Sequence, residues 1–268
     1  MFLKLGSHAG ASAIHQPLYL SREATLEEAI HSQHEIILRH MRTSESNSVL
    51  DLGCGVGASL AYLAGQETVS VKFTGITLSE SQATTGQQLI DSSGLSKRVE
   101  ILQGSYLELP ESISSVQLAF AIESFIHTPD PNAFFNEVTR VLEPGALLII
   151  FDDFLTRPPE SAEERRIIRD FEQGWKANTL LSSDVMKSTA QQSGLQCISG
   201  MDHTASLKYW RLRDKLVSLS IPIVRTLSSY SNYCTFLVGG DARQQALRKG
   251  LIGYREFVFK KQESISHE

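Results

Sequence analysis

The sequence predicts a doubly wound α/β fold with a mostly parallel, seven-stranded sheet and a helical cap insertion. Short apolar segments alternate with helical patterns from residue 48 to residue 151, as in parallel sheets that are covered by helices on both faces. Glycines follow the first of these segments directly, as they do in loops that bind nucleotides. With 268 residues, of which 41% are hydrophobic, the chain can bury the core that such a fold needs.

The individual elements follow from the spacing of apolar residues and from turn residues. Short apolar segments predict strands at 48–51, 69–76, 98–102, 116–122, 147–151, 195–201 and 254–260. Helical spacing predicts helices at 24–42, from Ser79 to Gly94, at 132–142, 162–171 and 183–193, and through most of 205–250. Thr25–Glu28 and Ser79–Gln82 match the capping-box pattern. Pro144-Gly145 predicts a turn into the fifth strand.

Composition restricts the classes of partner. The net charge of −5 gives no reason to expect nucleic acid. Residues 1–154 hold 8 Lys and Arg against 18 Asp and Glu, whereas residues 155–268 hold 17 against 12, which suits either solvated helix faces or an anionic substrate. The three cysteines show no disulfide or metal spacing, so a reducing, cytoplasmic location is expected. No segment approaches the roughly 20 apolar residues of a membrane span.

The loop after the first strand is the strongest single motif. Residues 49–57 read VLDLGCGVG, with glycines at 53, 55 and 57. Asp51 stands just before them, where a carboxylate suits a cationic group and disfavours a phosphate; it could also hold the loop amides. A nicotinamide-dependent oxidoreductase is disfavoured, because the G-x-G-x-x-G spacing is missing and the second strand ends without an acid.

Five segments in order carry a resemblance to a known family: VLDLGCGVG, GITLSESQ, ELP, ESFIHTPD and RVLEPG. Together they resemble the class I S-adenosylmethionine-dependent methyltransferases, in particular the small-molecule branch with sterol, tocopherol and antibiotic-sugar methyltransferases. The resemblance implies a Rossmann-like fold, S-adenosylmethionine as cofactor, S-adenosylhomocysteine as product, and a small secondary-metabolite or isoprenoid-like acceptor. It also implies three parts: an N-terminal lid and helix (1–44), the cofactor-binding α/β core (45–154), and the rest of the sheet with a substrate cap (155–268).

The resemblance assigns cofactor contacts residue by residue. The glycines would line the methionine and ribose portion, and the segment at 77–82 the ribose and adenine. Ser105 stands where an Asp often accepts from the adenine amino group, and a neutral hydroxyl makes a weaker contact there. The predicted cofactor-binding residues are Asp51, Gly53, Gly55, Gly57, Thr77, Leu78, Gln82, Ser105, Tyr106 and Ala121.

Three residues at the expected carboxyl edge of the sheet are catalytic candidates: Glu123, His127 and Asp152. The resemblance implies an acidic residue that supports catalysis at Asp152, with Asp153 as an adjacent alternative. His127 has a suitable intrinsic pKa for a general base, or it could bond the loop backbone. Glu123 could act as a base, stabilise a carbocation or fix the loop. Relatives that methylate oxygen often carry two adjacent histidines here, and this chain keeps only the second. That favours methylation of carbon mildly, while O-methylation and a non-catalytic binding role stay open.

The cap should determine the acceptor. Aromatic residues there could build an apolar pocket; the candidates are Phe171, Trp175, Tyr209, Trp210 and Tyr230. No metal-ligand cluster is evident in the sequence, and the oligomeric state is not predicted.

Overall fold

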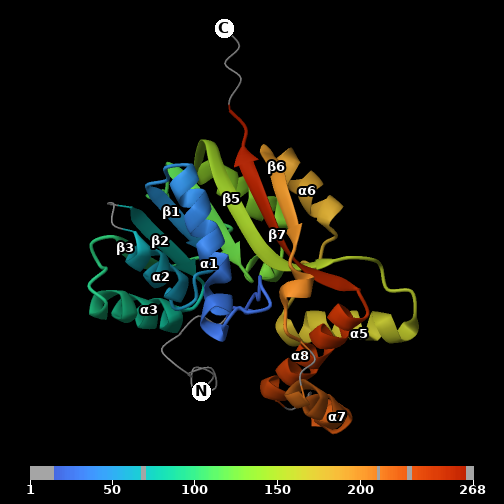
Figure 1. The fold of residues 1–268 in the computed structure, drawn as a ribbon. Helices are drawn as coiled ribbons and strands as arrows, with labels where there is room; N and C mark the ends of the chain where they lie inside the picture. Colours follow the sequence, from blue (N-terminus) through green and yellow to red (C-terminus); the bar gives the residue numbers. More distant parts are fainter. Residues whose placement is uncertain (1–14, 68–70, 210–211, 228–230, 264–268) are drawn as a thin grey trace.

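The structure, a computed structural model, describes residues 15–67, 71–209, 212–227 and 231–263 (Figure 1). The strands are β1 (Ser48–Leu52), β2 (Lys72–Thr77), β3 (Val99–Gln103), β4 (Val116–Ile122), β5 (Leu142–Leu155), β6 (Leu195–Asp202) and β7 (Ile252–Lys261). The helices are α1 (Leu26–Thr43), α2 (Ala58–Gln66), α3 (Glu80–Ser92), α4 (Pro131–Val141), α5 (Ala162–Trp175), α6 (Ser183–Gln192), α7 (Leu212–Leu227) and α8 (Asn232–Arg248), with short 3-10 turns η2 (Phe125–His127) and η3 (Thr204–Ser206).

The strands form one seven-stranded sheet in the order β3-β2-β1-β4-β5-β7-β6. The pairs β3–β2, β2–β1, β1–β4 and β4–β5 are parallel, whereas β7 runs antiparallel to both β5 and β6. The chain therefore reverses its winding between β1 and β4, which leaves a crevice at the carboxyl ends of these strands. This confirms the predicted doubly wound, mostly parallel seven-stranded sheet.

Each face of the sheet has its own apolar core, because side chains alternate along a strand. On one face, Val49 packs with buried residues of α1, α2 and α3, such as Ile37 and Leu60. On the other face, the next residue, Leu50, belongs with buried residues of α4 and α6, such as Phe134 and Met186. Continuously apolar strands are thus explained by burial on both faces.

One predicted helix start is confirmed and one is wrong in part. At α1, Thr25 and Glu28 form the full capping box. At α3, the Ser79 hydroxyl accepts from the Gln82 amide, but the Gln82 side chain does not return to the cap. Its Oε1 accepts instead from Oγ1 of Thr77, at 2.8 Å. Gln82 is thereby drawn toward the end of β2.

The turn predicted at Pro144-Gly145 lies inside a strand. β5 pairs with β4 on both sides of it, Val116 with Leu142 and Leu118 with Leu147. The two residues therefore belong to a bulge in β5, with Gly145 at φ +80°, rather than to the strand's boundary. Residues 69–70 of the predicted second strand lie outside the described residues.

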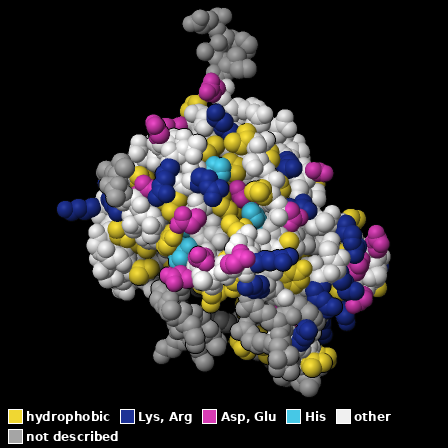
Figure 2. Space-filling view, viewed as in Figure 1, with side chains coloured by type: hydrophobic (Ala, Val, Ile, Leu, Met, Phe, Trp, Pro, Cys, Tyr) yellow, Lys and Arg dark blue, Asp and Glu magenta, His cyan; other side chains and the backbone are white. Residues whose placement is uncertain are grey.

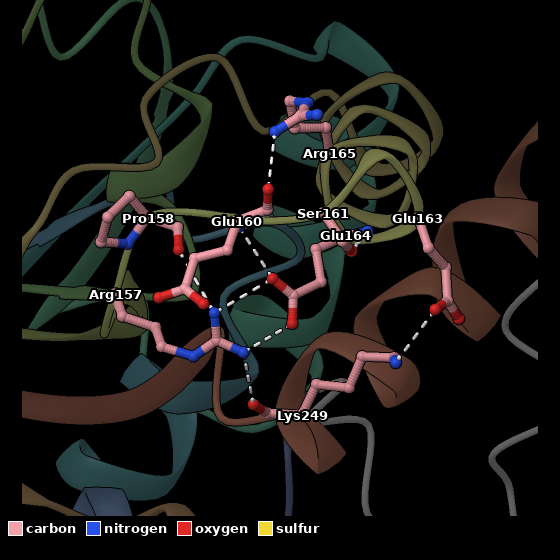
Figure 3. Close-up of polar contacts among 8 residues, drawn as sticks. All are labelled: Arg157, Pro158, Glu160, Ser161, Glu163, Glu164, Arg165 and Lys249. Carbon is pink, nitrogen blue, oxygen red and sulfur yellow. Dashed lines mark hydrogen bonds and ion pairs between the residues drawn. The ribbon is translucent and has the colours of Figure 1, made fainter.

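Helices α5, α7 and α8, together called the cap from here on, gather at one end of the sheet, beyond the carboxyl ends of the parallel strands (Figure 1). The loop into α5 is tied to its neighbours by charged groups (Figure 3). Arg157 donates two hydrogen bonds to the Glu164 carboxylate, at 3.0 and 2.6 Å, and a third to the carbonyl of Lys249 at 3.3 Å. The bonds from Arg157 lower the pKa of Glu164 to about 2. The network joins the start of α5 to the end of α8.

Within the described ranges, no helix is both long enough and apolar enough to cross a membrane.

Candidate active site

A cavity of about 770 Å³ lies at the carboxyl edge of the parallel strands and extends beneath α5 and α8. Its wall on the sheet side includes the loop after β1 and the ends of β2 and β4, and its wall on the cap side includes Phe171 and Trp175. This is the place where open α/β sheets bind ligands.

The glycine loop supplies backbone to this wall. Gly53 and Gly55 line the cavity, and the backbone amides of Gly53 and Cys54 both donate to the carbonyl of Ile76, at 2.9 Å. Gly53 has φ +101°, and a Cβ there would lie 2.5 Å from Cβ of Ser124. Only glycine fits such a position. Gly57 is the N-cap of α2, at φ +70°, and is not among the residues of the cavity wall.

Asp51 lies behind the loop, in β1. Its side chain is 4% exposed, and burial raises its pKa well above the usual range. None of the described residues donates a hydrogen bond to its carboxylate. A buried carboxylate without donors is costly in its charged form unless a cation pairs with it. Asp51 is not among the residues that line the cavity. No amide of the described loop donates to it, so the alternative of holding loop amides is not what the structure shows, and its pairing with an ammonium group stays a prediction.

Most of the residues predicted to meet ribose and adenine lie on the cavity wall. Thr77, Leu78, Gln82 and Tyr106 line the cavity. The Tyr106 hydroxyl donates to the carbonyl of Ser124 at 3.1 Å, which holds the ring against the loop after β4.

Two further predicted cofactor residues, Ser105 and Ala121, are not among the residues that line the cavity. The Ser105 hydroxyl accepts from the amide of Leu107 at 3.1 Å and so stabilises its own turn. Ala121 is fully buried in β4, and the next residue, Ile122, reaches the cavity instead. The roles of Ser105 and Ala121 stay predictions.

Glu123 lines the cavity in a constrained conformation. It is a non-glycine residue at φ +53°, and its Oε1 accepts from the amide of Gln16 at 2.7 Å and from the hydroxyl of Tyr254 at 3.0 Å. Burial raises its pKa to about 7, although Arg243 and both hydrogen bonds act in the opposite direction. Such a carboxyl exchanges a proton readily near neutral pH.

Asp152 also lines the cavity, but its carboxylate serves the backbone. It accepts from the amides of Ile126 and Asp153, both at 2.9 Å, and burial raises its pKa. The first bond anchors η2, the turn that carries His127. The adjacent Asp153 forms a buried ion pair with Arg243 of α8.

His127 is exposed at the cavity mouth, and its Nδ1 lies 3.1 Å from the carbonyl of Lys176. A carbonyl only accepts, so Nδ1 carries the proton and the Nε2 of the neutral ring keeps a lone pair. His127 can therefore bond the loop backbone through Nδ1 and still act as a base through Nε2, so the two interpretations from the sequence are compatible. Within the described part of the chain, no group of three or more His, Cys, Asp or Glu is arranged to hold a metal ion.

The cap side of the cavity is aromatic. Phe171 and Trp175 line it as expected, Tyr209 does not, and Trp210 and Tyr230 lie outside the described residues. Sequence reasoning missed a second aromatic group from α8. Tyr233 and Phe236 reach the wall, and the ring of Phe236 stacks on Trp175 with centroids 5.6 Å apart.

Sequence reasoning also missed Tyr254, which contacts Glu123, and Arg243, which contacts Asp153. They come from β7 and α8, more than 80 residues along the chain from the acids that they contact. No local motif marks them, so only an expectation that the sheet closes near its C-terminal strands could have placed them.

Comparison with known proteins agrees with this geometry. Residues 16–209 match the family model of mycolic acid cyclopropane synthetase. The chain is 28% identical over 180 residues to cycloartenol-C-24-methyltransferase 1 of Oryza sativa subsp. japonica, covering 66% of this chain and 52% of that protein, so it spans about half of that relative. It is 30% identical over 181 residues to the O-methyltransferase rstn1 of Aspergillus nomiae, covering 68% and 78%.

Among solved structures, the cyclopropane synthase MmaA2 of Mycobacterium tuberculosis superposes with a TM-score of 0.71 at 17% identity, covering 94% of this chain and 90% of that one, which shows the shared fold. The family match extends from the N-terminal segment beside Glu123, through the glycine loop, to the segment before α7. The chain thus belongs to the mycolic acid cyclopropane synthetase family, within the class I small-molecule methyltransferases that use S-adenosylmethionine.

Proposed function

We propose that the protein transfers the methyl group of S-adenosylmethionine to a small organic acceptor held beneath α5 and α8. One observation carries the proposal: a single cavity joins the glycine loop to an aromatic space under the cap. When bound, the cofactor supplies a methyl group that is already activated. Two relatives support a small organic acceptor: one is named as a C-methyltransferase of a sterol and the other as an O-methyltransferase.

The residues present fit this cofactor. The Asp51 carboxylate would pair with its ammonium group from behind the glycine loop: it does not line the cavity, but it is buried and receives no hydrogen bond from the described residues. Gly53 and Gly55 would allow its close approach to the backbone. Thr77, with Leu78 and Gln82, would lie against ribose and adenine, beside Tyr106. Gly57, Ser105 and Ala121 would support this wall from behind.

Glu123 would handle the proton that the acceptor loses. It faces the cavity, and its pKa of about 7 lets the carboxylate accept a proton at neutral pH. Asp152 would act by positioning, because its carboxylate already accepts two backbone amides. The rings of Phe171, Trp175 and Phe236 would hold the acceptor's apolar body and exclude water.

A second version of the reaction, methylation of a hydroxyl with His127 as base, also rests on a specific observation. Donation from Nδ1 to the carbonyl of Lys176 leaves Nε2 able to accept a proton at the cavity mouth. Replacing His127 and Glu123 separately by Gln distinguishes the two versions, since only the true base should remove the pH dependence of transfer.

The cofactor assignment is tested by calorimetric titration with S-adenosylmethionine, S-adenosylhomocysteine and NADH. Asp51→Asn preserves the shape of the side chain and should weaken binding of both adenosyl compounds at least about tenfold, the loss of one buried charge pair. Asp91→Asn, an exposed carboxyl on α3, should bind like the wild type. Heat with NADH alone would contradict the proposal. Cofactor binding with no transfer to a panel of hydroxylated and isoprenoid acceptors would instead indicate a binding protein.

A further inference from the structure

A row of four polar side chains runs from the active-site cavity to a second groove beside α1. The Nε2 of His15 lies 3.0 Å from Oγ of Ser59, and the same hydroxyl lies 2.9 Å from Nε2 of His34. The Nδ1 of His34 lies 3.2 Å from Nδ1 of His31. His15 lines the active-site cavity. His31 lines a separate groove along α1.

The middle of this row is sealed from water. His34 is fully buried and Ser59 is 2% exposed, yet both ring nitrogens of His34 have a partner. At the outer end, the ring of His31 stacks on Tyr62 with centroids 3.9 Å apart, and the Tyr62 hydroxyl donates to Glu35 at 2.7 Å. The rings are therefore held in one arrangement that joins two cavities.

We propose that this row, His15–Ser59–His34–His31, carries protons between the active-site cavity and the outer groove. The inference rests on the proposed function in one respect: methyl transfer to an acceptor that bears hydrogen leaves one proton to be removed from the cavity.

Each hop in the row conserves protons. A proton binds Nδ1 of His15, whose Nε2 proton passes to Ser59; the Ser59 proton passes to Nε2 of His34. The Nδ1 proton of His34 then passes to Nδ1 of His31, whose Nε2 proton leaves to the groove. Every N–H or O–H bond that breaks is replaced by one that forms on the next group, and the row ends in the complementary set of tautomers.

The environment keeps the inner rings neutral, as such a relay requires. Burial lowers the pKa of His15 to about 4 and that of His34 to about 3. At pH 7 neither ring holds a proton as imidazolium, so neither traps one. Burial also lowers the pKa of His31, and the nearby charges of Glu27 and Glu35 act in the opposite direction.

The test follows the ring proton of His34 and the backbone amide of Leu38 in uniformly ¹⁵N-labelled protein, and needs neither cofactor nor acceptor. Water-exchange NMR should show this proton exchanging at least about 100-fold faster than the buried Leu38 amide of α1, which waits for local unfolding. His31→Phe keeps a ring on Tyr62 but removes both nitrogens, and Ser59→Ala removes the linking hydroxyl. The double variant should exchange at the rate of the Leu38 amide.

His40→Phe makes the same substitution on α1 outside the row and should leave the exchange unchanged. A wild-type ring proton that exchanges no faster than the Leu38 amide would overturn the proposal. So would fast exchange that survives in the double variant. Because no methyl transfer is measured, either result leaves the proposed function standing. Conversely, fast exchange of the His34 ring proton in a protein that binds no S-adenosylmethionine would support the relay and contradict the proposed function.

Discussion

At the residue scale, the arrangement of Glu123 is unusual for a carboxyl at the end of a strand. Its backbone lies at φ +53°, a conformation that costs a non-glycine residue about 1–3 kcal/mol. Contacts from distant parts of the chain hold it there, namely the amide of Gln16 and the hydroxyl of Tyr254. Strain that is maintained in this way at a cavity wall is typical of functional sites.

Glu123→Gln tests its role as a base. We expect the rate of methyl transfer to fall about 10²–10⁴-fold, the usual contribution of a general base. The wild-type rate should rise with pH through about 7, where the Glu123 carboxyl loses its proton, and the variant should lack this rise. Single-turnover rates with labelled S-adenosylmethionine from pH 5.5 to 8.5 measure both effects. A variant that keeps the rise would identify His127 as the base.

Tyr254→Phe tests the hydrogen bond that holds Glu123. The tyrosine hydroxyl lowers the pKa of this carboxyl, so its removal should raise that pKa and move the rise in rate to higher pH. Transfer should therefore slow near neutral pH and recover in alkaline buffer, while cofactor affinity stays unchanged. The pH profile of the same single-turnover assay is the measurement. An equal loss of rate at every pH would show that the hydroxyl acts only structurally.

At the element scale, the cap depends on a close crossing of two helices. A Cβ on Gly174 of α5 would lie 2.4 Å from Cα of Gly239 of α8, and one on Gly239 would lie 2.6 Å from Cα of Gly174. The helices thus touch through their backbones at this point. The contact places Trp175 of α5 beside Phe236 of α8, and these two rings form part of the cap wall.

Gly239→Ala should therefore destabilise the protein by about 1–3 kcal/mol, the usual cost of overpacking, although alanine favours helices. Gly240→Ala is the matched control on the same helix, because its Cβ would meet only Nε1 of Trp175, at 3.6 Å. We expect that variant to match the wild type or to gain up to about 1 kcal/mol from helix propensity. Denaturant unfolding measures both. Equal stabilities for the two variants would contradict the close crossing.

The elements themselves were largely predictable from sequence, because their signals are local. The strand at 116–122 was predicted with the bounds of β4, and the Thr25 capping box was correct. The errors arose where a contact between elements overrides a local pattern. Gln82 bonds Thr77 across a turn instead of closing its own cap, and Pro144 lies in a bulge because β5 pairs on both sides of it.

At the scale of the whole molecule, only the sheet side of the site could be predicted, because only that side is marked by local sequence signals. Its sheet side follows from glycines and acids at strand ends, so Gly53, Glu123 and Asp152 could be named from their order in the sequence. The other residues of the site come from the C-terminal part of the chain, and their positions depend on how that part folds back onto the sheet. β7 inserts between β5 and β6, which brings Tyr254 to Glu123 from 131 residues away.

The buried ion pair between Arg243 and Asp153 connects this returning part to the sheet, and it gives the last prediction. Both side chains are under 10% exposed, so Arg243→Met should destabilise the protein by about 3–5 kcal/mol by leaving a buried carboxylate unpaired. Adding Asp153→Asn removes that charge and should restore part of the stability in denaturant unfolding. The double variant lacks Arg243, which lowers the pKa of Glu123, and also the smaller opposing effect of Asp153, which raises it. Its rise in transfer rate should therefore lie at slightly higher pH than that of the wild type. Recovery of stability without this shift would show that the pair of charges stabilises the fold but has no net effect on the Glu123 carboxyl.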